Sequence, residues 1–531
     1  MMYTEISNSE ILDSFPRSLV LHKFPSTIQL LSQGGDSRIA VSGLHSLNRY
    51  GCSPFPNPDL LAFGSSTASV ISDHAFSAAD ELRDRIASAI DEEAPEEVYL
   101  QEMNRIRKEF LKLNDLDNIS NLQMIFGASG TDIHLIAAQI TNSENSNSKL
   151  IIMPEHSETG SGVPTALSSR HFSNRSALGD NVIEGNCVEK SSESEVISIS
   201  MRYANGNLRP TSIVDAEVEA LVKNAVDSGR QVLLILVDTS KTGLISPSLS
   251  CAMKLKQTFP EFVNVLVDAC QFRISSHTLR EYISNDFMVT VTGSKFLTGP
   301  VFSGALLIPE SVSKKHLSSP ISVGIRAYSS KAEWPMNSPA SAALKNRANF
   351  GLMLRWEAAL EELRQFKTVP ETQITSFMKR FSNAVVNRLE NDDHFSYIPT
   401  RKMDRYSLNV RSSWDDVPSI FSFALCRSSK NGIKETLSHE ETVKVHELLR
   451  LPANDPRRSG SRFMDRRIEP VSCQLGQPVV FSSISGKPTS ALRMCLSSRL
   501  IVEACSSGGK KESEVIGRAL LALDNLAEIL K

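Results

Sequence analysis

The sequence predicts an α/β protein with a doubly wound, mainly parallel sheet in a large domain and a smaller α+β domain after it. Between residues 149 and 309, short apolar runs rich in Val, Ile and Leu alternate with amphipathic stretches. Continuous apolar strands suit a parallel sheet covered on both faces, and alternation of strand and helix is typical of α/β folds. The runs are KLIIMP (149–154), QVLLILVD (231–238), FVNVLVD (262–268), DFMVTVTG (286–293) and SGALLIP (303–309).

The flanking sequence suggests three parts. Residues 1–70 are rich in Ser, Pro and Gly and are expected to form an N-terminal arm over the surface. Residues 71–339 would form the large domain, beginning with helical spacing from Asp73 to Leu113. Residues 340–531 would form the small domain, with a long helix over 341–366. Two segments carry no functional interpretation: a polar stretch at 168–198, expected to be a surface loop, and a basic loop at 454–470.

Composition excludes several classes of protein. The 531 residues are 41% hydrophobic and carry a formal net charge of -3, and no basic block indicates nucleic-acid binding. No apolar run approaches the roughly 18 residues of a membrane span, and the N-terminus lacks the pattern of a secretory signal. The eight cysteines form no C-x-x-C pair, so we expect reduced thiols in a cytoplasmic protein and no metal site.

Ligands of open α/β sheets bind outside the carboxyl ends of the strands, so the polar residues that follow the apolar runs are the candidates. Asp268 ends FVNVLVD, and a carboxylate there needs a partner. The protonated ring nitrogen of pyridoxal 5'-phosphate (PLP) would be one. A structural aspartate or a helix N-cap is the alternative for this residue alone.

Two further features follow the same logic. Lys295 comes after the run FMVTVTG, at the mouth of the sheet, where desolvation favours the neutral amine that attacks an aldehyde. GASGTDIHLIAAQI (127–140) is a Gly/Ser/Thr turn that opens a helix, which is the usual setting of a phosphate site. Taken singly, they could be a surface lysine and a plain N-cap turn. Their order, phosphate turn, then Asp, then Lys, favours a PLP enzyme.

These motifs resemble those of the class V aminotransferase and cysteine desulfurase family, over roughly residues 60–531. The resemblance implies fold type I of the PLP-dependent transferases, with a mainly parallel seven-stranded-type sheet, and a homodimer. It implies that Lys295 forms the Schiff base and moves protons, that Asp268 pairs with the ring nitrogen, and that His156 stacks on the ring. It also implies cofactor contacts from Ser129, Gly130 and Thr131 (phosphate turn), Thr292 (phosphate), Gln271 (ring hydroxyl), and Ser240 and Ser294, which replace the residues usual in the family.

The resemblance also suggests a substrate site. SALRMCLSS resembles the strand that carries an arginine for the substrate carboxylate, so Arg493 is the candidate and a surface arginine the alternative. Arg326 and Arg355 are weaker rivals. Asn337 and Ser338 lie in the segment that would reach the cofactor phosphate of a second subunit. The mobile cysteine loop of the desulfurases is missing, and Cys426 and Cys473 do not replace it.

The expected reaction begins at the Cα of an amino acid or amine. Aminotransferase-like chemistry is the first expectation, and C–S lysis or decarboxylation the alternatives. A PLP-fold protein that binds without catalysis is a further alternative. An unrelated nucleotide-binding protein is disfavoured because the sequence has neither G-x-x-x-x-G-K-[ST] nor a clear G-x-G-x-x-G after its first strand.

Overall fold

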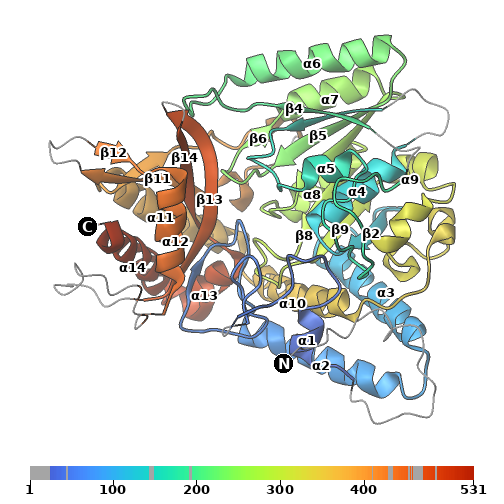
Figure 1. Ribbon diagram of the computed structural model, residues 1–531, viewed down its shortest axis with the longest axis horizontal. Helices are drawn as coiled ribbons and strands as arrows, with labels where there is room; N and C mark the ends of the chain where they lie inside the picture. Colours follow the sequence, from blue (N-terminus) through green and yellow to red (C-terminus); the bar gives the residue numbers. More distant parts are fainter. Residues whose placement is uncertain are drawn as a thin grey trace, which may run out of the picture.

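The computed structural model describes residues 24–43, 46–142, 149–189, 194–408, 411–428, 434–452, 455, 457, 471–484 and 487–530. Two sheets organise these residues, a large one and a smaller one beside it (Figure 1). The strand order of the large sheet is β2-β9-β8-β7-β5-β3-β4, with the short β6 paired to β5. Its strands are β2 (Gln123–Gly127), β3 (Leu150–Pro154), β4 (Glu195–Ile199), β5 (Val232–Asp238), β6 (Ile245–Ser246), β7 (Val263–Ala269), β8 (Met288–Thr292) and β9 (Gly304–Ile308).

The large sheet is mainly parallel and is covered on both faces. Strands β4, β3, β5, β7 and β8 run parallel, whereas β9 is antiparallel to both β8 and β2. Along β5, Val232, Leu234 and Leu236 join one hydrophobic core, and the alternate residues join a second. This period of two is what the pleat of a strand buried on both sides produces.

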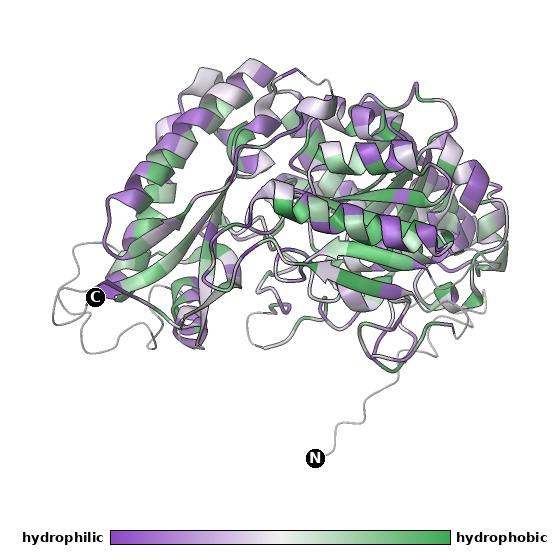
Figure 2. Cartoon of the chain, turned by 90° about the horizontal axis from the view of Figure 1, so that it is seen from above, coloured by the Kyte–Doolittle hydropathy of each residue, from purple (hydrophilic) through white to green (hydrophobic). Residues whose placement is uncertain are grey.

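Helices supply the covering layers. The first core packs against α2 (Asp73–Ala89), α3 (Pro95–Leu113), α6 (Thr211–Asp227), α7 (Leu249–Thr258), α8 (Ser276–Ser284) and α10 (Phe350–Lys367). The second packs against α4 (Gly130–Ile140), α5 (Val163–Leu167) and α9 (Glu310–His316). Apolar residues concentrate in the strands, while the helices alternate between hydrophobic and hydrophilic positions (Figure 2). None of the helices in the described residues is both long and apolar enough to cross a membrane.

The second sheet has the order β1-β13-β14-β11-β10, with β12 paired to β11. Its strands are β1 (Leu61–Phe63), β10 (Phe395–Ile398), β11 (Ile420–Ser428), β12 (Lys434–Thr436), β13 (Cys473–Ile484) and β14 (Lys487–Cys495). The helices of this region are α11 (Glu371–Glu390), α12 (His439–Arg450), α13 (Ser498–Gly509) and α14 (Glu512–Leu530). This α+β arrangement, beside the mainly parallel sheet, confirms the predicted fold class.

Three segments differ from their sequence-based descriptions. The N-terminal arm contains α1 (Thr27–Leu31) and contributes β1, which pairs with β13 of the small sheet. The helix expected at 341–366 begins only at Phe350, because Asn349 accepts a hydrogen bond from the Leu352 amide as N-cap. The polar stretch at 168–198 ends in β4, the edge strand beside β3. Most of the basic stretch 454–470 lies outside the described residues.

Candidate active site

Asp268, Thr292 and the turn that begins α4 meet at the carboxyl ends of β7 and β8. The N-terminus of α4 faces this edge so closely that a Cβ atom on Gly130 would lie 2.8 Å from Cys270 Sγ and 3.4 Å from Thr292 Cγ2. A larger residue at position 130 would therefore displace the Cys270 side chain. The phosphate turn, defined here as Ser129, Gly130 and Thr131, is thus beside the strand ends that carry Asp268 and Lys295.

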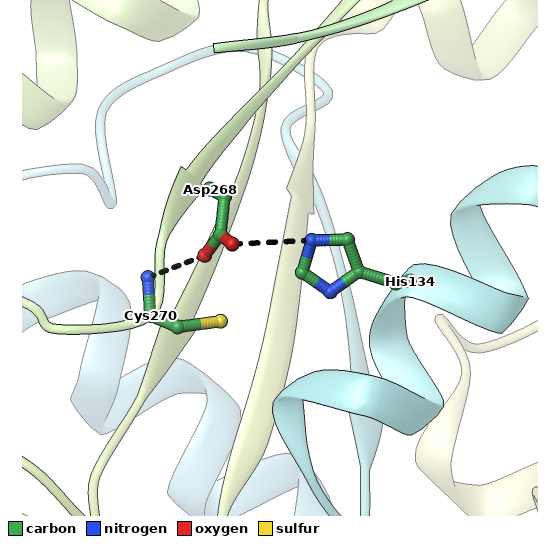
Figure 3. Close-up of side chains that lie close together, drawn as sticks. All are labelled: His134, Asp268 and Cys270. Atoms are coloured by element: carbon green, nitrogen blue, oxygen red, sulfur yellow. Dashed lines mark hydrogen bonds and ion pairs between the residues drawn. The ribbon is translucent and has the colours of Figure 1, made fainter. Parts of the chain in front are cut away.

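Asp268 is a buried carboxylate held from two sides (Figure 3). Its Oδ1 accepts a hydrogen bond of 3.1 Å from the Cys270 amide, and its Oδ2 lies 3.4 Å from His134 Nε2. Burial opposes ionisation, but His134, Lys295 and the Cys270 side chain outweigh it and hold the pKa of Asp268 well below its usual range. The side chain is therefore an anion at neutral pH.

His134 is a site residue that the sequence analysis missed. It lies one helical turn after Gly130 on α4, is 1% exposed, and its Nδ1 is 2.6 Å from the Gly130 carbonyl. A carbonyl can only accept, so Nδ1 carries the hydrogen of this bond. The spacing of four residues from the phosphate turn was the available signal, since residues at i and i+4 share a helix face.

Lys295 follows β8 and is half-buried. Its charge contributes to the low pKa of Asp268, so amine and carboxylate lie near each other, as the sequence predicted. Among the described residues its Nζ has no hydrogen-bond partner. A second amine, Lys241, is close by, and burial together with the charges of Arg493 and Lys295 lowers its pKa to about 7. Two lysines, Lys295 and Lys241, therefore lie at this site.

The phosphate turn has hydroxyl, amide and guanidinium donors. Ser129 is the N-cap of α4 and donates a hydrogen bond to the Asp132 carboxylate. Arg38, from the N-terminal arm, donates to Ser129 Oγ and Thr131 Oγ1 at 3.4 Å each. Nothing in the local sequence around Arg38 indicates this contact. The arrangement can hold an anion.

Thr292 and Ser294 lie at the end of β8. The Thr292 hydroxyl donates to the Cys270 carbonyl at 2.7 Å, and the Ser294 hydroxyl lies 3.4 Å from Thr292 Oγ1. Both are buried beside the phosphate turn. Their predicted roles as cofactor contacts stay predictions.

Other predicted contact residues have protein partners of their own. Ser240 Oγ donates at 2.8 Å to Glu158, a buried carboxylate that also accepts from Thr242 and Arg202. The Gln271 amide donates at 3.0 Å to the Ser66 carbonyl of the arm. His156 follows β3 and is exposed, whereas His134 is the histidine beside Asp268.

The candidate carboxylate site lies between β14, β13 and the arm. Arg493 is 1% exposed and donates to the Thr67 hydroxyl and to the Gln477 carbonyl, at 3.0 and 2.7 Å. Its Nε and the hydroxyl of Ser66 are buried without a partner among the described residues. Both lie against Gly476, where a Cβ would be 2.7 Å from Ser66 Oγ and 3.1 Å from Arg493 Nε. Two unsatisfied polar atoms at one point suit a polar ligand group.

The rival arginines are engaged elsewhere. Arg355 is buried and donates to carbonyls of Phe302 and Gly34, at 2.7 Å each, so it anchors the arm. Arg326 is exposed and bonds the Ala343 carbonyl. Asn337, the candidate for a contact with a second subunit, is exposed, and Ser338 is half-buried.

The cysteines do not form a nucleophilic site. Cys426 and Cys473 are buried, as are five others, and Cys187 is half-buried. His134, Asp268 and Cys270 do offer three potential metal-ligand atoms within 4.8 Å of one another. Burial and the charge of Asp268 raise the pKa of the Cys270 thiol well above its usual range, so the thiol keeps its proton at neutral pH when no metal is bound.

Comparison with solved structures supports the same fold. No family model and no curated protein sequence matches the chain. A cystine C–S lyase solved with its product cysteine persulfide has a TM-score of 0.52 at 15% identity, covering 88% of this chain and 98% of the other. A NifS-like protein has a TM-score of 0.50 at 12% identity, covering 88% and 99%. A variant of the same lyase with glycine covalently linked to its PLP cofactor scores 0.51 at 14% identity, covering 88% and 97%. The chain has the fold of these proteins, fold type I.

Proposed function

We propose that this protein is a PLP-dependent enzyme that acts at the Cα of an amino acid and holds the cofactor through Lys295. One observation carries the proposal: an ionised, buried Asp268, a lysine near it and an anion-binding helix N-terminus occupy one edge of the sheet. PLP needs these three groups, for its ring nitrogen, its aldehyde and its phosphate. The PLP cofactor of one structural neighbour, the lyase variant with linked glycine, agrees with this assignment.

The residues fit the cofactor in charge and in hydrogen bonding. The phosphate turn offers backbone N–H groups, two hydroxyls and the positive end of the α4 dipole. Asp268 remains an anion and so would stabilise a protonated ring nitrogen. When bound, PLP supplies an electron sink for the bond that breaks at Cα.

The protein's own groups would then position the substrate and move protons. Lys295, once released from the cofactor, has a free Nζ that can transfer a proton to or from Cα. The Nε of Arg493 and the hydroxyl of Ser66, both unpartnered in the described residues, would bind the substrate carboxylate. These donors would fix the orientation of the amino acid relative to Lys295.

Class V aminotransferase-like transfer is the first reaction we propose, and C–S lysis is the second. C–S lysis is the second proposal because one structural neighbour is a cystine C–S lyase. A desulfurase needs a mobile thiol, and it is disfavoured because seven of the eight cysteines are buried. Conversion of the cofactor band to the pyridoxamine form by an amino acid would indicate transfer. Release of sulfide from cystine or cysteine would indicate lysis.

The deciding experiment is the absorbance spectrum of the purified protein with added PLP. Wild type should show the yellow absorbance band of PLP bound to a lysine, and Lys295→Ala should lack it. Lys241→Ala is the matched control, because Lys241 is the neighbouring amine with a lowered pKa. After borohydride reduction, peptide mapping should find the cofactor on Lys295.

Two outcomes would contradict the proposal. The cofactor could be found on Lys241, or wild type could show no band at any PLP concentration. The second outcome would favour a protein with this fold that acts by binding alone. We also propose a homodimer, as the family resemblance implies, and sedimentation of the PLP-loaded protein would test it.

A further inference from the structure

We propose that Arg38, from the N-terminal arm, is a cofactor-binding residue that closes the phosphate site with its guanidinium group. This inference rests on the proposed PLP function and goes beyond it. It makes the arm a component of the cofactor site, although the sequence suggests only a surface segment.

The geometry of the guanidinium group carries the inference. Nη1 donates to Thr131 Oγ1 and Nη2 to Ser129 Oγ, both at 3.4 Å. These two hydroxyls belong to the phosphate turn. The distances are long for such bonds, whose usual range is about 2.7–3.2 Å. The two terminal nitrogens therefore face the two hydroxyls that a phosphate would use, and its oxygens could take shorter bonds from all four groups.

Arg38 is held in this orientation by other contacts. Asp36 accepts bonds from Nε at 2.9 Å and from Nη2 at 2.6 Å, on the other edge of the group. The rings of Phe302 and Phe172 lie 5.1 and 5.8 Å from the guanidinium carbon. A guanidinium fixed by a carboxylate and two rings loses little entropy when an anion binds.

The charge balance also requires a cation. Besides Asp36, the buried Asp132 carboxylate lies beside Ser129. A phosphate dianion would meet two acidic side chains here, and neutral hydroxyls and the α4 dipole would have to offset them without Arg38. A planar fork of N–H donors matches phosphate oxygens better than an ammonium group does.

The arm reaches this position through several contacts distant from the phosphate turn. Arg355 of α10 binds the Gly34 carbonyl at 2.7 Å. Arg83 of α2 binds the carbonyls of Pro25 and Phe24, at 3.2 and 2.7 Å. Arg83 therefore tethers the arm without touching the phosphate turn, and it provides a matched control.

The test compares binding of PLP with binding of pyridoxal, which lacks the phosphate, by titration of the cofactor absorbance. Wild type should prefer PLP. In Arg38→Gln the ratio of PLP affinity to pyridoxal affinity should fall about tenfold or more, since a charge-assisted bond is lost. Its affinity for pyridoxal should stay unchanged. Arg38→Lys should retain part of the preference, and Arg83→Gln should retain all of it.

Three outcomes separate the possibilities. An unchanged preference in Arg38→Gln would overturn the inference. Equal loss of PLP and pyridoxal binding in Arg38→Gln, without loss in Arg83→Gln, would make Arg38 a structural support of the whole site and would also overturn it. If wild type binds neither compound, the proposed function itself fails. Thermal unfolding of each variant without cofactor checks that the fold is intact.

Discussion

The ring of His134 connects the phosphate turn to the ring-nitrogen site, because Nδ1 lies 2.6 Å from the Gly130 carbonyl and Nε2 lies 3.4 Å from Asp268 Oδ2. Since the Gly130 carbonyl can only accept, Nδ1 carries a hydrogen. On the other side of the ring, Nε2 faces the Asp268 carboxylate, and His134 is one of the groups that lower the pKa of Asp268. The imidazole thus favours the ionised form of Asp268, on which the electron-withdrawing power of the bound ring depends.

Replacing His134 by Gln should therefore impair the cofactor chemistry more than the fold. We expect the amino-acid-induced change of the cofactor band to slow by about tenfold or more, a usual scale for loss of a group that orients or charges a catalytic one. Without the imidazole, the pKa of Asp268 should rise, so the slowing should be greatest at acid pH. Stopped-flow absorbance across pH would measure both effects.

His156→Gln is the informative comparison, because the family resemblance predicts His156 as the ring-stacking residue and the structure leaves it exposed. A larger effect at 156 than at 134 would contradict the role we assign to His134. Unfolding in denaturant would separate a loss of function from a loss of stability.

The sequence allowed Asp268 and Lys295 to be brought together because Asp268 ends one buried apolar run and Lys295 follows another. The apolar runs at 262–268 and 286–293 became β7 and β8, which are parallel neighbours. Parallel strands place their carboxyl ends at one edge, so a local pattern sufficed to predict a long-range contact. The turn at 127–131 followed the same logic, since it begins a helix at that edge.

Other site residues had no such signal. Arg38 and Ser66 lie in an arm whose local sequence indicates neither strand nor helix, and their positions depend on contacts with residues hundreds of positions away, such as Arg355 and Gln271. Strand β4 was concealed within a polar stretch because it is an edge strand whose residues are mostly exposed or half-buried. Its weak apolar pattern is typical of a loop, and only its pairing with β3 identifies it as a strand.

Arg493→Gln should weaken binding of substrates that carry a carboxylate. The expected rise in the KM of an amino acid is about tenfold to a hundredfold, since a charge-assisted bond is lost while the remaining groups stay. The corresponding amine, without the carboxylate, should bind equally to both proteins. Titration of the cofactor band with each compound is the measurement.

Ser66→Ala should also weaken binding of the amino acid and leave binding of the amine unchanged. The effect should be smaller than in Arg493→Gln, because the lost donor is a neutral hydroxyl. Arg326→Gln is the control, since Arg326 is exposed and bonds the Ala343 carbonyl rather than the groups that contact Arg493. A loss of carboxylate selectivity in Arg326→Gln, with none in Arg493→Gln, would reverse the assignment of the two arginines.

The preference for PLP over pyridoxal should fall as pH rises through neutrality. Burial and the charge of Asp36 raise the pKa of Asp132 to about 7, against the opposing effects of Ser129 and Arg38. Below that pH Asp132 is neutral and can donate to Ser129, which leaves the serine hydroxyl free to donate to phosphate. Above it, the carboxylate takes the Ser129 hydrogen and repels the phosphate.

Asp132→Asn is neutral at every pH, so its preference for PLP should be nearly flat from about pH 6.5 to about pH 8.5, where the phosphate is mostly a dianion. Absorbance titrations with PLP and with pyridoxal at several pH values would measure the preference for PLP. Both compounds react with the same lysine, so the pH dependence of that reaction cancels in the ratio of the two affinities. A slope in Asp132→Asn equal to that of wild type would show that another group titrates.

Asp238 and Arg405 form a buried ion pair that joins the large sheet to the chain that leads into the small one. Arg405 Nε and Nη2 donate to the two carboxylate oxygens at 2.7 and 2.6 Å, and the Tyr282 hydroxyl adds a bond of 2.6 Å. Asp238→Leu should lower the free energy of unfolding by about 3–5 kcal/mol, because the buried guanidinium loses its two-bond carboxylate partner and keeps only the ion pair with Asp416 at 3.9 Å.

The double variant Asp238→Leu/Arg405→Met should recover a large part of that loss, because it removes the uncompensated charge and leaves an apolar contact. Chemical denaturation monitored by circular dichroism measures both. Lys254→Ala, which removes one partner of an exposed pair with Glu219, should leave the midpoint unchanged. If Asp238→Leu were as stable as Lys254→Ala, the pair would not anchor this junction. A double variant less stable than Asp238→Leu would instead mean that Arg405 stabilises the junction through its bond to the Asp415 carbonyl.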